Sequence, residues 1–195
     1  MSFKFSKPLR GENHRVGLSR RAFLNRVGVA AAGALLVPST DAFAKLLGKD
    51  RRITLYNTNT DEAWSFVCSP TQNYDPRMLN RFNHFLRDHR AEEIHTMDPA
   101  LLDLLYALTV LTGGRGEYNV ISGYRSPETN QMLRKMGHGV AEHSMHIQGK
   151  AIDLRTDDVG ARALQQAALA LQQGGVGYYH AADFVHVDTG DVRSW

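Results

Sequence analysis

The stretch from His143 to Arg155 reads H-S-M-H-I-Q-G-K-A-I-D-L-R, and its second half indicates how the chain folds around a polar site. Residues 151–155 alternate as a strand does, so Asp153 points to one face while Ile152 and Leu154 point to the other. A carboxylate between two aliphatic residues is usually paired, coordinated or catalytic, because burying it alone is costly. Asp153 is therefore the first candidate site residue.

A second strand with the same alternation is expected at residues 184–188, which read F-V-H-V-D. Val185 and Val187 share its apolar face, and His186 lies on the polar face. If the apolar faces of both strands pack against helices, Asp153 and His186 look toward the same side of the sheet.

A second histidine, His146, lies seven residues before Asp153. On one straight strand this odd spacing would place the two side chains on opposite faces. The chain must therefore turn between them if they are to meet, and Gly149 is where it can turn.

Two histidines and a carboxylate that converge are a common set of zinc ligands, with the fourth position left for water. Zinc in such a site lowers the pKa of its water to about 7, which predicts hydrolysis of an amide. Taken singly, His146 or His186 could equally be a hydrogen-bonded core histidine. Together with Asp153 and the spaced glycine and alanine, the pattern favours a metal site.

Hydrophobic periodicity and turn residues predict a single α+β domain around this site. We expect a small, mainly antiparallel sheet with helices packed on one side, because short connections join the elements and the last two strands close the chain. The predicted strands are 53–57, 63–68, 118–122, 151–155, 176–179 and 184–188, and the predicted helices are 76–88, 99–112, 127–136 and 157–173.

The first 44 residues are typical of an export signal. A basic region precedes the apolar run Val27–Val37, and residues 42–44 provide the small residues that a signal peptidase recognises. The sequence S-R-R-A-F-L at residues 19–24 is similar to the twin-arginine consensus. The apolar run is shorter than the roughly 20 residues of a membrane span, although an uncleaved anchor is the alternative. We expect export to the periplasm and cleavage of the signal.

Removing this segment leaves one domain, residues 45–195, with a different charge. Residues 1–44 contain seven of the 23 Lys and Arg and two of the 20 Asp and Glu, so the remainder has a net charge of −2. Nucleic-acid binding therefore loses its compositional support. Cys68 is the single cysteine, cannot form an internal disulfide, and is expected to be a small core residue of a strand.

The residues around the predicted site resemble those of the zinc D-Ala-D-Ala peptidases. The resemblance is carried by S-x-H-x-x-G-x-A-x-D at residues 144–153, by the later His186 and by S-G-Y-R at residues 122–125. More narrowly, L-Y-N-T-N-T, G-G-V-G-Y-Y and F-V-H-V-D-T-G are similar to a periplasmic, signal-bearing branch of murein endopeptidases. The resemblance covers nearly all of residues 50–195 and implies a Hedgehog-like α+β fold.

The resemblance also implies roles for individual residues. His146, Asp153 and His186 match the three ligands of one zinc ion per chain. Arg125 matches an arginine that polarises the scissile carbonyl, although it could instead form a structural ion pair with Asp153 or Glu128. Residues expected to support the ligands or to contact substrate are Ser122, Tyr124, Ser144 and Asp188.

The catalytic base departs from the family pattern. In the family it is often a glutamate three residues before the last ligand, and that position is occupied here by Asp183, one methylene shorter. We expect Asp183 to act as the base, with Asp188 or His180 as the alternatives.

The resemblance therefore predicts a monomeric, zinc-dependent peptidase that acts on peptidoglycan in the periplasm and contacts a membrane only if its signal is uncleaved. The bond is left open: D-Ala–diaminopimelate, diaminopimelate–diaminopimelate or a terminal D-Ala would all suit the chemistry. A D,D-carboxypeptidase is thus one alternative. A non-catalytic peptidoglycan-binding module and a zinc hydrolase of small amides are the others.

Overall fold

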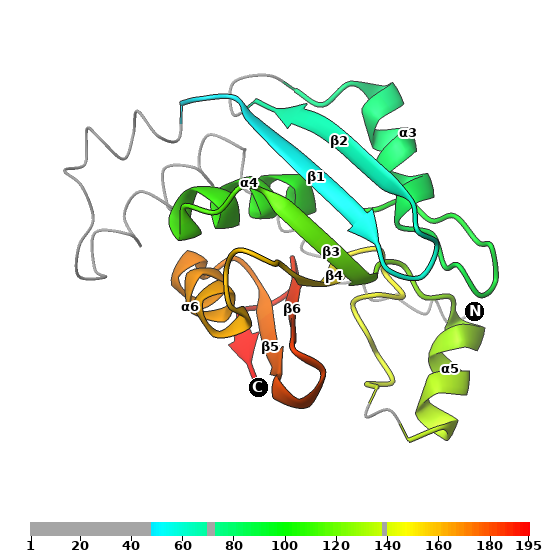
Figure 1. Ribbon diagram of the computed structural model, residues 1–195. Helices are drawn as coiled ribbons and strands as arrows, with labels where there is room; N and C mark the ends of the chain where they lie inside the picture. Colours follow the sequence, from blue (N-terminus) through cyan, green and yellow to red (C-terminus); the bar gives the residue numbers. More distant parts are fainter. Residues whose placement is uncertain (1–47, 70–72, 138–139) are drawn as a thin grey trace, which may run out of the picture.

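The computed structural model describes residues 48–69, 73–137 and 140–195, which form one mixed sheet flanked by helices (Figure 1). The seven strands of this part of the chain follow the order β2-β1-β3-β4-β6-β5-β7. The β1–β3 and β5–β7 pairs are parallel and the others are antiparallel, so the predicted α+β class is confirmed. The strands are β1 (Arg51–Asn57), β2 (Ala63–Cys68), β3 (Glu117–Ser122), β4 (Ala151–Arg155), β5 (Gly175–Tyr179), β6 (Phe184–Asp188) and β7 (Arg193–Ser194), and the helices are α3 (Pro76–Phe85), α4 (Ala100–Thr112), α5 (Pro127–Lys135), α6 (Ala161–Leu171) and the short η1 (His180–Ala182).

The core lies between one face of the sheet and the helices. Helix α4 is buried along almost its whole length and packs beside α6, as its unbroken apolar sequence predicts (Figure 1). Alternate residues of the strands point into this core, and Cys68 on β2 is fully buried there, as predicted. The strand residues in this hydrophobic core are Ile53, Leu55, Trp64, Phe66, Cys68, Tyr118, Val120, Ile152, Leu154, Val176, Val185 and Val187.

Two helices begin at aspartate or serine caps followed by proline. Asp75 accepts a hydrogen bond from the amide of Arg77 at 2.8 Å, and Ser126 accepts one from Thr129 at 3.1 Å. These caps satisfy amides that the first helical turn leaves without a partner. The cap at Ser126 matters for function, because it ends the loop that carries Arg125.

The prediction of a helix over 157–173 is wrong at its beginning, since α6 begins at Ala161. The residues before it form a loop in which Asp157 accepts a hydrogen bond from Asn119 and Asp158 accepts one from the amide of Arg115. These acidic side chains tie the loop to the neighbouring strand instead of starting a helix. Strand β7 also went unpredicted, because two residues carry no periodic pattern.

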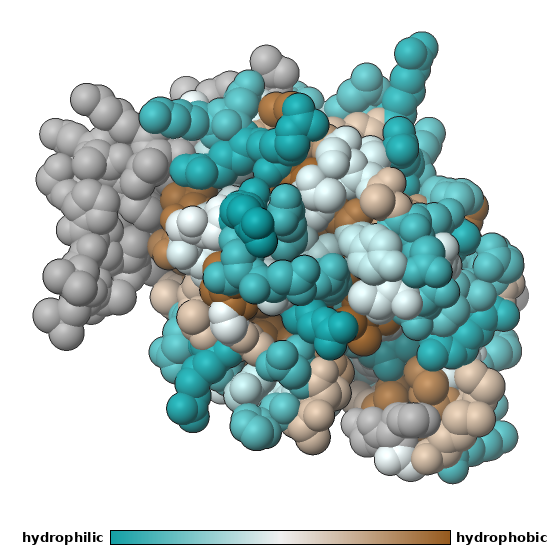
Figure 2. Space-filling model, in the orientation of Figure 1, coloured by the Kyte–Doolittle hydropathy of each residue, from teal (hydrophilic) through white to brown (hydrophobic). Residues whose placement is uncertain are grey.

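The predicted export signal, residues 1–44, lies outside the described residues. Within the described part of the chain, no helix has the length and apolar character needed to cross a membrane. Hydrophilic residues predominate on the face shown in Figure 2, and apolar residues are scattered among them.

Candidate metal centre

Two of the three candidate ligands face each other on paired strands. Asp153 of β4 and His186 of β6 are directly opposite in the antiparallel register. The neighbouring residues on these strands are buried in the helix-covered core, so Asp153 and His186 project from the opposite face of the sheet. The predicted register of the two strands is therefore confirmed.

The third candidate, His146, comes from the loop before β4. Gly149 has a φ of +65°, a conformation that other residues adopt only with strain. A Cβ at Gly149 would also overlap the carbonyl oxygen of Thr96. The loop therefore turns at the predicted glycine, and this turn brings His146 to the strand residue Asp153.

The three side chains meet through single atoms. His146 Nε2 lies 3.1 Å from His186 Nδ1 and 3.1 Å from Asp153 Oδ1. His186 Nδ1 lies 2.8 Å from the same Asp153 oxygen. These three residues form a group that could hold a metal ion.

The outer nitrogen of each histidine has its own hydrogen-bond acceptor. His146 Nδ1 is 2.6 Å from the carbonyl oxygen of Gly123, and His186 Nε2 is 3.0 Å from Asp188 Oδ2. Because a carbonyl or carboxylate oxygen accepts, each outer nitrogen carries the proton. The lone pair of each inner nitrogen is thereby directed at Asp153 and at the other histidine.

Two imidazole nitrogens and a carboxylate oxygen within about 3 Å of one another could share a cation. Ligands bound tetrahedrally at about 2.0–2.1 Å would lie roughly 3.3 Å apart, close to the separations found here. Metal-binding histidines commonly donate their second N–H to a carbonyl or carboxylate, as both do here. The residues thus fit a metal ion, and their nitrogen and oxygen donors suit zinc.

The electrostatics of the buried group also favour a bound cation. Burial alone would raise the pKa of Asp153, but the adjacent His146 and His186 outweigh it and hold that pKa well below its usual range. Burial lowers the pKa of His146, against the opposing effect of Asp153. Asp153 is therefore a carboxylate, and His146 is a neutral imidazole.

Arg125 lies at the edge of the group. Its Nη2 is 3.7 Å from Asp153 Oδ2, and its Nε has no hydrogen-bond partner among the residues that the structure describes. Burial lowers the pKa of Arg125, while Asp153 raises it. The contact with Asp153 is long for an ion pair, so the guanidinium keeps donors for another acceptor.

The loop that carries Arg125 is held from two sides. On one side, the amide of Tyr124 donates to the carbonyl of Leu86 at 2.7 Å, and the amide of Ser126 donates to Asp88 at 2.9 Å. On the other side, the amide of Arg125 donates to the carbonyl of His146 at 3.3 Å. The backbone segments that carry Arg125 and the candidate ligand His146 are therefore held together.

The predicted supporting residues take different positions. Ser144 Oγ accepts a hydrogen bond from the amide of His146 at 3.3 Å, which makes it part of the ligand loop. Ser122 is opposite Asp153 in the register of β3 and β4. The hydroxyl of Tyr124 donates to Glu93, its ring stacks on His95, and burial raises its pKa to about 12.

The three candidates for the base differ in their surroundings. Asp188 is fully engaged, since it accepts hydrogen bonds from His186, Arg193, Gly175 and Gly190. Asp183 is exposed at the end of η1 with a φ of +50°, and its side chain makes no hydrogen bond or ion pair within the described chain. His180 is exposed, and its ring packs edge-on against Tyr178. Asp183 and His180 thus remain predictions, whereas Asp188 has a structural role.

The sequence reasoning missed Trp195. Its ring centroid is 5.2 Å from that of the candidate ligand His186, and its Nε1 donates to the hydroxyl of Tyr179 at 3.2 Å. A Cβ at Gly177 would lie 2.6 Å from this ring. A glycine inside a strand indicates a close approach, so Gly177 was the signal that something packs there.

Comparisons with known proteins agree with this geometry. The sequence model of a peptidase family described as Peptidase_M15_2, peptidoglycan L,D-endopeptidase MepK, matches residues 45–195. The chain is 41% identical over 178 residues to the peptidoglycan L,D-endopeptidase MepK of Escherichia coli K12, which covers 91% of this chain and 97% of that protein. It is 39% identical over 181 residues to the probable peptidoglycan L,D-endopeptidase MepK of Haemophilus influenzae, covering 92% and 97%.

Proposed function

The chain belongs to the peptidase family of the peptidoglycan L,D-endopeptidase MepK, and from this premise we propose that it is a zinc enzyme that cleaves L,D-peptide bonds between peptidoglycan stems. As a member of this family it is an endopeptidase of peptidoglycan and takes part in cell wall remodelling. The observation that carries the zinc assignment is the convergence of His146 Nε2, His186 Nδ1 and Asp153 Oδ1.

The proposed metal ligands are His146, Asp153 and His186. A zinc ion held by them would supply Lewis acidity and would lower the pKa of a bound water to about 7. Gly123 and Asp188 hold the two imidazoles in the ligating tautomers through their outer nitrogens.

The remaining steps are assigned to side chains beside the ligands. Arg125 donates to the scissile carbonyl oxygen and stabilises the negative charge that develops there. Its long contact with Asp153 supports this role, because a tight ion pair would use the same donors. Asp183 takes a proton from the attacking water and passes it to the leaving amine.

The substrate is found outside the cytoplasm, so the enzyme acts in an extracytoplasmic compartment. We propose the periplasm, reached through the twin-arginine-type signal of residues 1–44, where the cleaved enzyme works as a monomer. The periplasmic location and the export route rest on the sequence pattern at Arg20 and Arg21 and on the apolar run that follows.

The test is digestion of intact sacculi with the purified, zinc-loaded enzyme, followed by mass spectrometry of the released muropeptides. We expect loss of cross-linked dimers joined through L,D bonds. Loss of D,D-linked dimers instead, or release of terminal D-Ala alone, would overturn the bond assignment.

Asp183→Asn tests the proposed base. We expect it to retain stoichiometric zinc and to lose about 100-fold or more in kcat, which is typical when a general base is removed. The matched variant Asp153→Ala should lose both zinc and activity. Full activity of Asp183→Asn would transfer the role to another group, with His180 the next candidate.

A further inference from the structure

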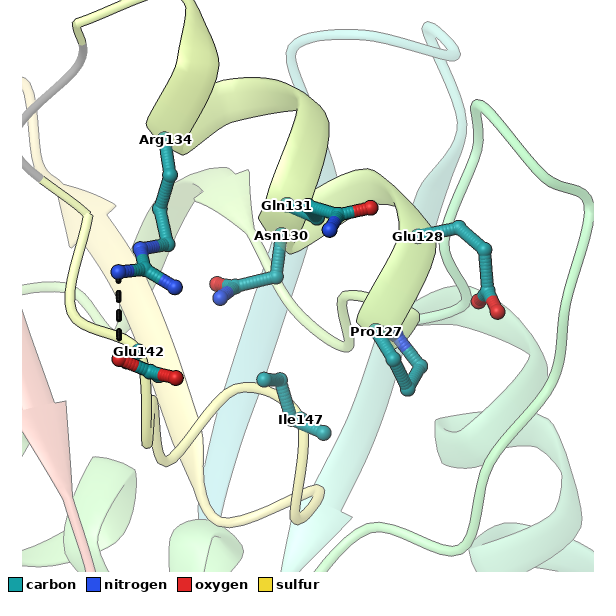
Figure 3. Close-up of a pocket in the computed structure, with 7 residues that line it drawn as sticks. All are labelled: Pro127, Glu128, Asn130, Gln131, Arg134, Glu142 and Ile147. Carbon is teal, nitrogen blue, oxygen red and sulfur yellow. Dashed lines mark hydrogen bonds and ion pairs between the residues drawn. The ribbon is translucent and has the colours of Figure 1, made fainter.

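A polar groove runs beside the proposed metal centre, between helix α5 and the loop that precedes β4 (Figure 3). Its volume is about 260 Å³. One wall carries Arg134 and the other carries Glu142, which face each other at the left of the view, and Ile147 lies below and to the right of both. The groove is therefore lined by charged side chains from two separate segments.

Two residues that line the groove are neighbours in sequence of the proposed site residues. Ile147 directly follows the ligand His146, and Pro127, at the other end of the lining, is two residues from Arg125. The hydrogen bond from the amide of Arg125 to the carbonyl of His146 joins these two segments at 3.3 Å. A substrate whose scissile carbonyl lies at Arg125 can thus extend into the groove.

The ion pair between Arg134 and Glu142 in the groove can open, so that each side chain can bind another charged group. Arg134 Nη2 lies 3.3 Å from Glu142 Oε2, and the two side chains are 42% and 66% exposed. An ion pair this exposed contributes little to stability, so opening it costs little. Asn130 is 3% exposed and donates from Nδ2 to the carbonyl of Ala141 at 3.1 Å, which holds the Glu142 loop against α5.

We propose that Arg134 and Glu142 form a binding site for a free amino-acid end of the substrate, that is, a carboxylate and an ammonium that neighbour each other. A guanidinium beside a carboxylate is the electrostatic complement of this zwitterion, with Arg134 binding the carboxylate and Glu142 the ammonium. Diaminopimelate in a peptidoglycan stem has such an end when only its other end is part of the cleaved bond. The proposal rests on the proposed function, because it places this residue on the carbonyl side of that bond.

The test uses three synthetic cross-linked dimers that differ only at this free end. One has the free ammonium and carboxylate, the second has the carboxylate converted to an amide, and the third has the amine acetylated. We expect wild-type enzyme to cleave the first with a kcat/KM about three to ten times that for either modified dimer.

The variants assign each charge to its partner. Arg134→Gln should lose the preference for the free carboxylate and keep the preference for the free amine, while Glu142→Gln should do the reverse. Arg134→Gln should cleave the amidated dimer at the wild-type rate, and Glu142→Gln should do the same with the acetylated dimer. These rates would show that both variants are folded. Lys135→Gln is the matched control, because it removes a charge from the neighbouring position of α5 outside the groove and should keep both preferences.

The outcomes separate the two proposals. Equal rates on all three dimers by wild-type enzyme would overturn the amino-acid site and leave the endopeptidase assignment intact. Unchanged preferences in Arg134→Gln and Glu142→Gln would also overturn it. Cleavage of none of the dimers, while D,D-linked dimers are cleaved, would overturn the proposed bond and this site with it.

Discussion

Asp188 determines which nitrogen of His186 faces the proposed metal. Burial would raise the pKa of Asp188, but hydrogen bonds from His186, Arg193 and two backbone amides outweigh it and hold that pKa well below its usual range. The residue is therefore an anion that accepts the outer proton of His186. An asparagine would present an amide N–H to one of these donors.

Asp188→Asn should consequently weaken zinc binding about 10- to 100-fold, the usual cost of losing a partner behind a ligand. Competition with a chromophoric chelator measures this affinity, and the melting temperature of the metal-free protein reports any general loss of stability. Asp183→Asn is the comparison, since its exposed side chain is expected to leave zinc affinity unchanged. Wild-type affinity in Asp188→Asn would contradict the orienting role.

At the level of elements, the loop from Ser144 to Gly149 has to turn sharply to deliver His146. Gly149→Ala should be strongly destabilising, because the positive φ is strained for alanine and its Cβ would overlap the carbonyl oxygen of Thr96. Gly137→Ala is the matched control: its φ is +78°, but nothing lies within 4 Å of the added Cβ.

Gly137→Ala is thus expected to cost about 1 kcal/mol from backbone strain, and Gly149→Ala clearly more. Urea unfolding of the metal-free proteins measures both free energies, and zinc affinity reports the displacement of His146. Equal destabilisation by the two substitutions would show that the contact with Thr96 has no energetic role.

The segment after helix α3 supports the Arg125 loop through Asp88. Burial would raise the pKa of Asp88, but hydrogen bonds from Thr129, Ser126 and Arg90 outweigh it and lower that pKa. Because the pKa is lower in the folded protein, the unfolded chain binds the proton more tightly. The stabilisation is complete above about pH 4, the usual pKa of aspartate, and is lost as the pH falls through the folded value.

Asp88→Asn should therefore lower the free energy of unfolding by a constant amount between about pH 5 and pH 8. Below pH 4 the difference from wild type should shrink as the wild-type carboxyl takes up its proton. Chemical unfolding of both proteins across this range tests the prediction, and a difference that does not depend on pH would contradict it.

On the scale of the whole molecule, the local sequence pattern predicted the strands and the candidate ligands. It did not predict contacts between residues that are far apart in the sequence. Period-two alternation was sufficient for β4 and β6, and with them for the placement of Asp153 and His186. The start of α6 depends on contacts to Asn119 and Arg115 across the sheet, which sequence spacing does not reveal. The anchoring of Ser126 by Asp88 joins residues 38 apart and was missed for the same reason.

The export signal is a prediction from the sequence, and it can be tested on the full-length chain. Substituting lysine for both Arg20 and Arg21 should block twin-arginine transport, because that pathway depends on the arginine pair. Cell fractionation should then find the uncleaved protein in the cytoplasm, with its enzymatic activity intact. Periplasmic accumulation of the double variant would indicate the general secretion route.

The packing of Trp195 against His186 gives the molecule an optical reporter of the proposed metal site. The chain contains two tryptophans, and the other, Trp64, is buried against Phe66 in the core. A divalent ion bound at His186 would change the charge near the Trp195 indole, whose ring centroid is 5.2 Å from that of His186 and whose emission responds to nearby charge. Zinc could thus be titrated by intrinsic fluorescence without any label, with Trp195→Phe as the silent reference.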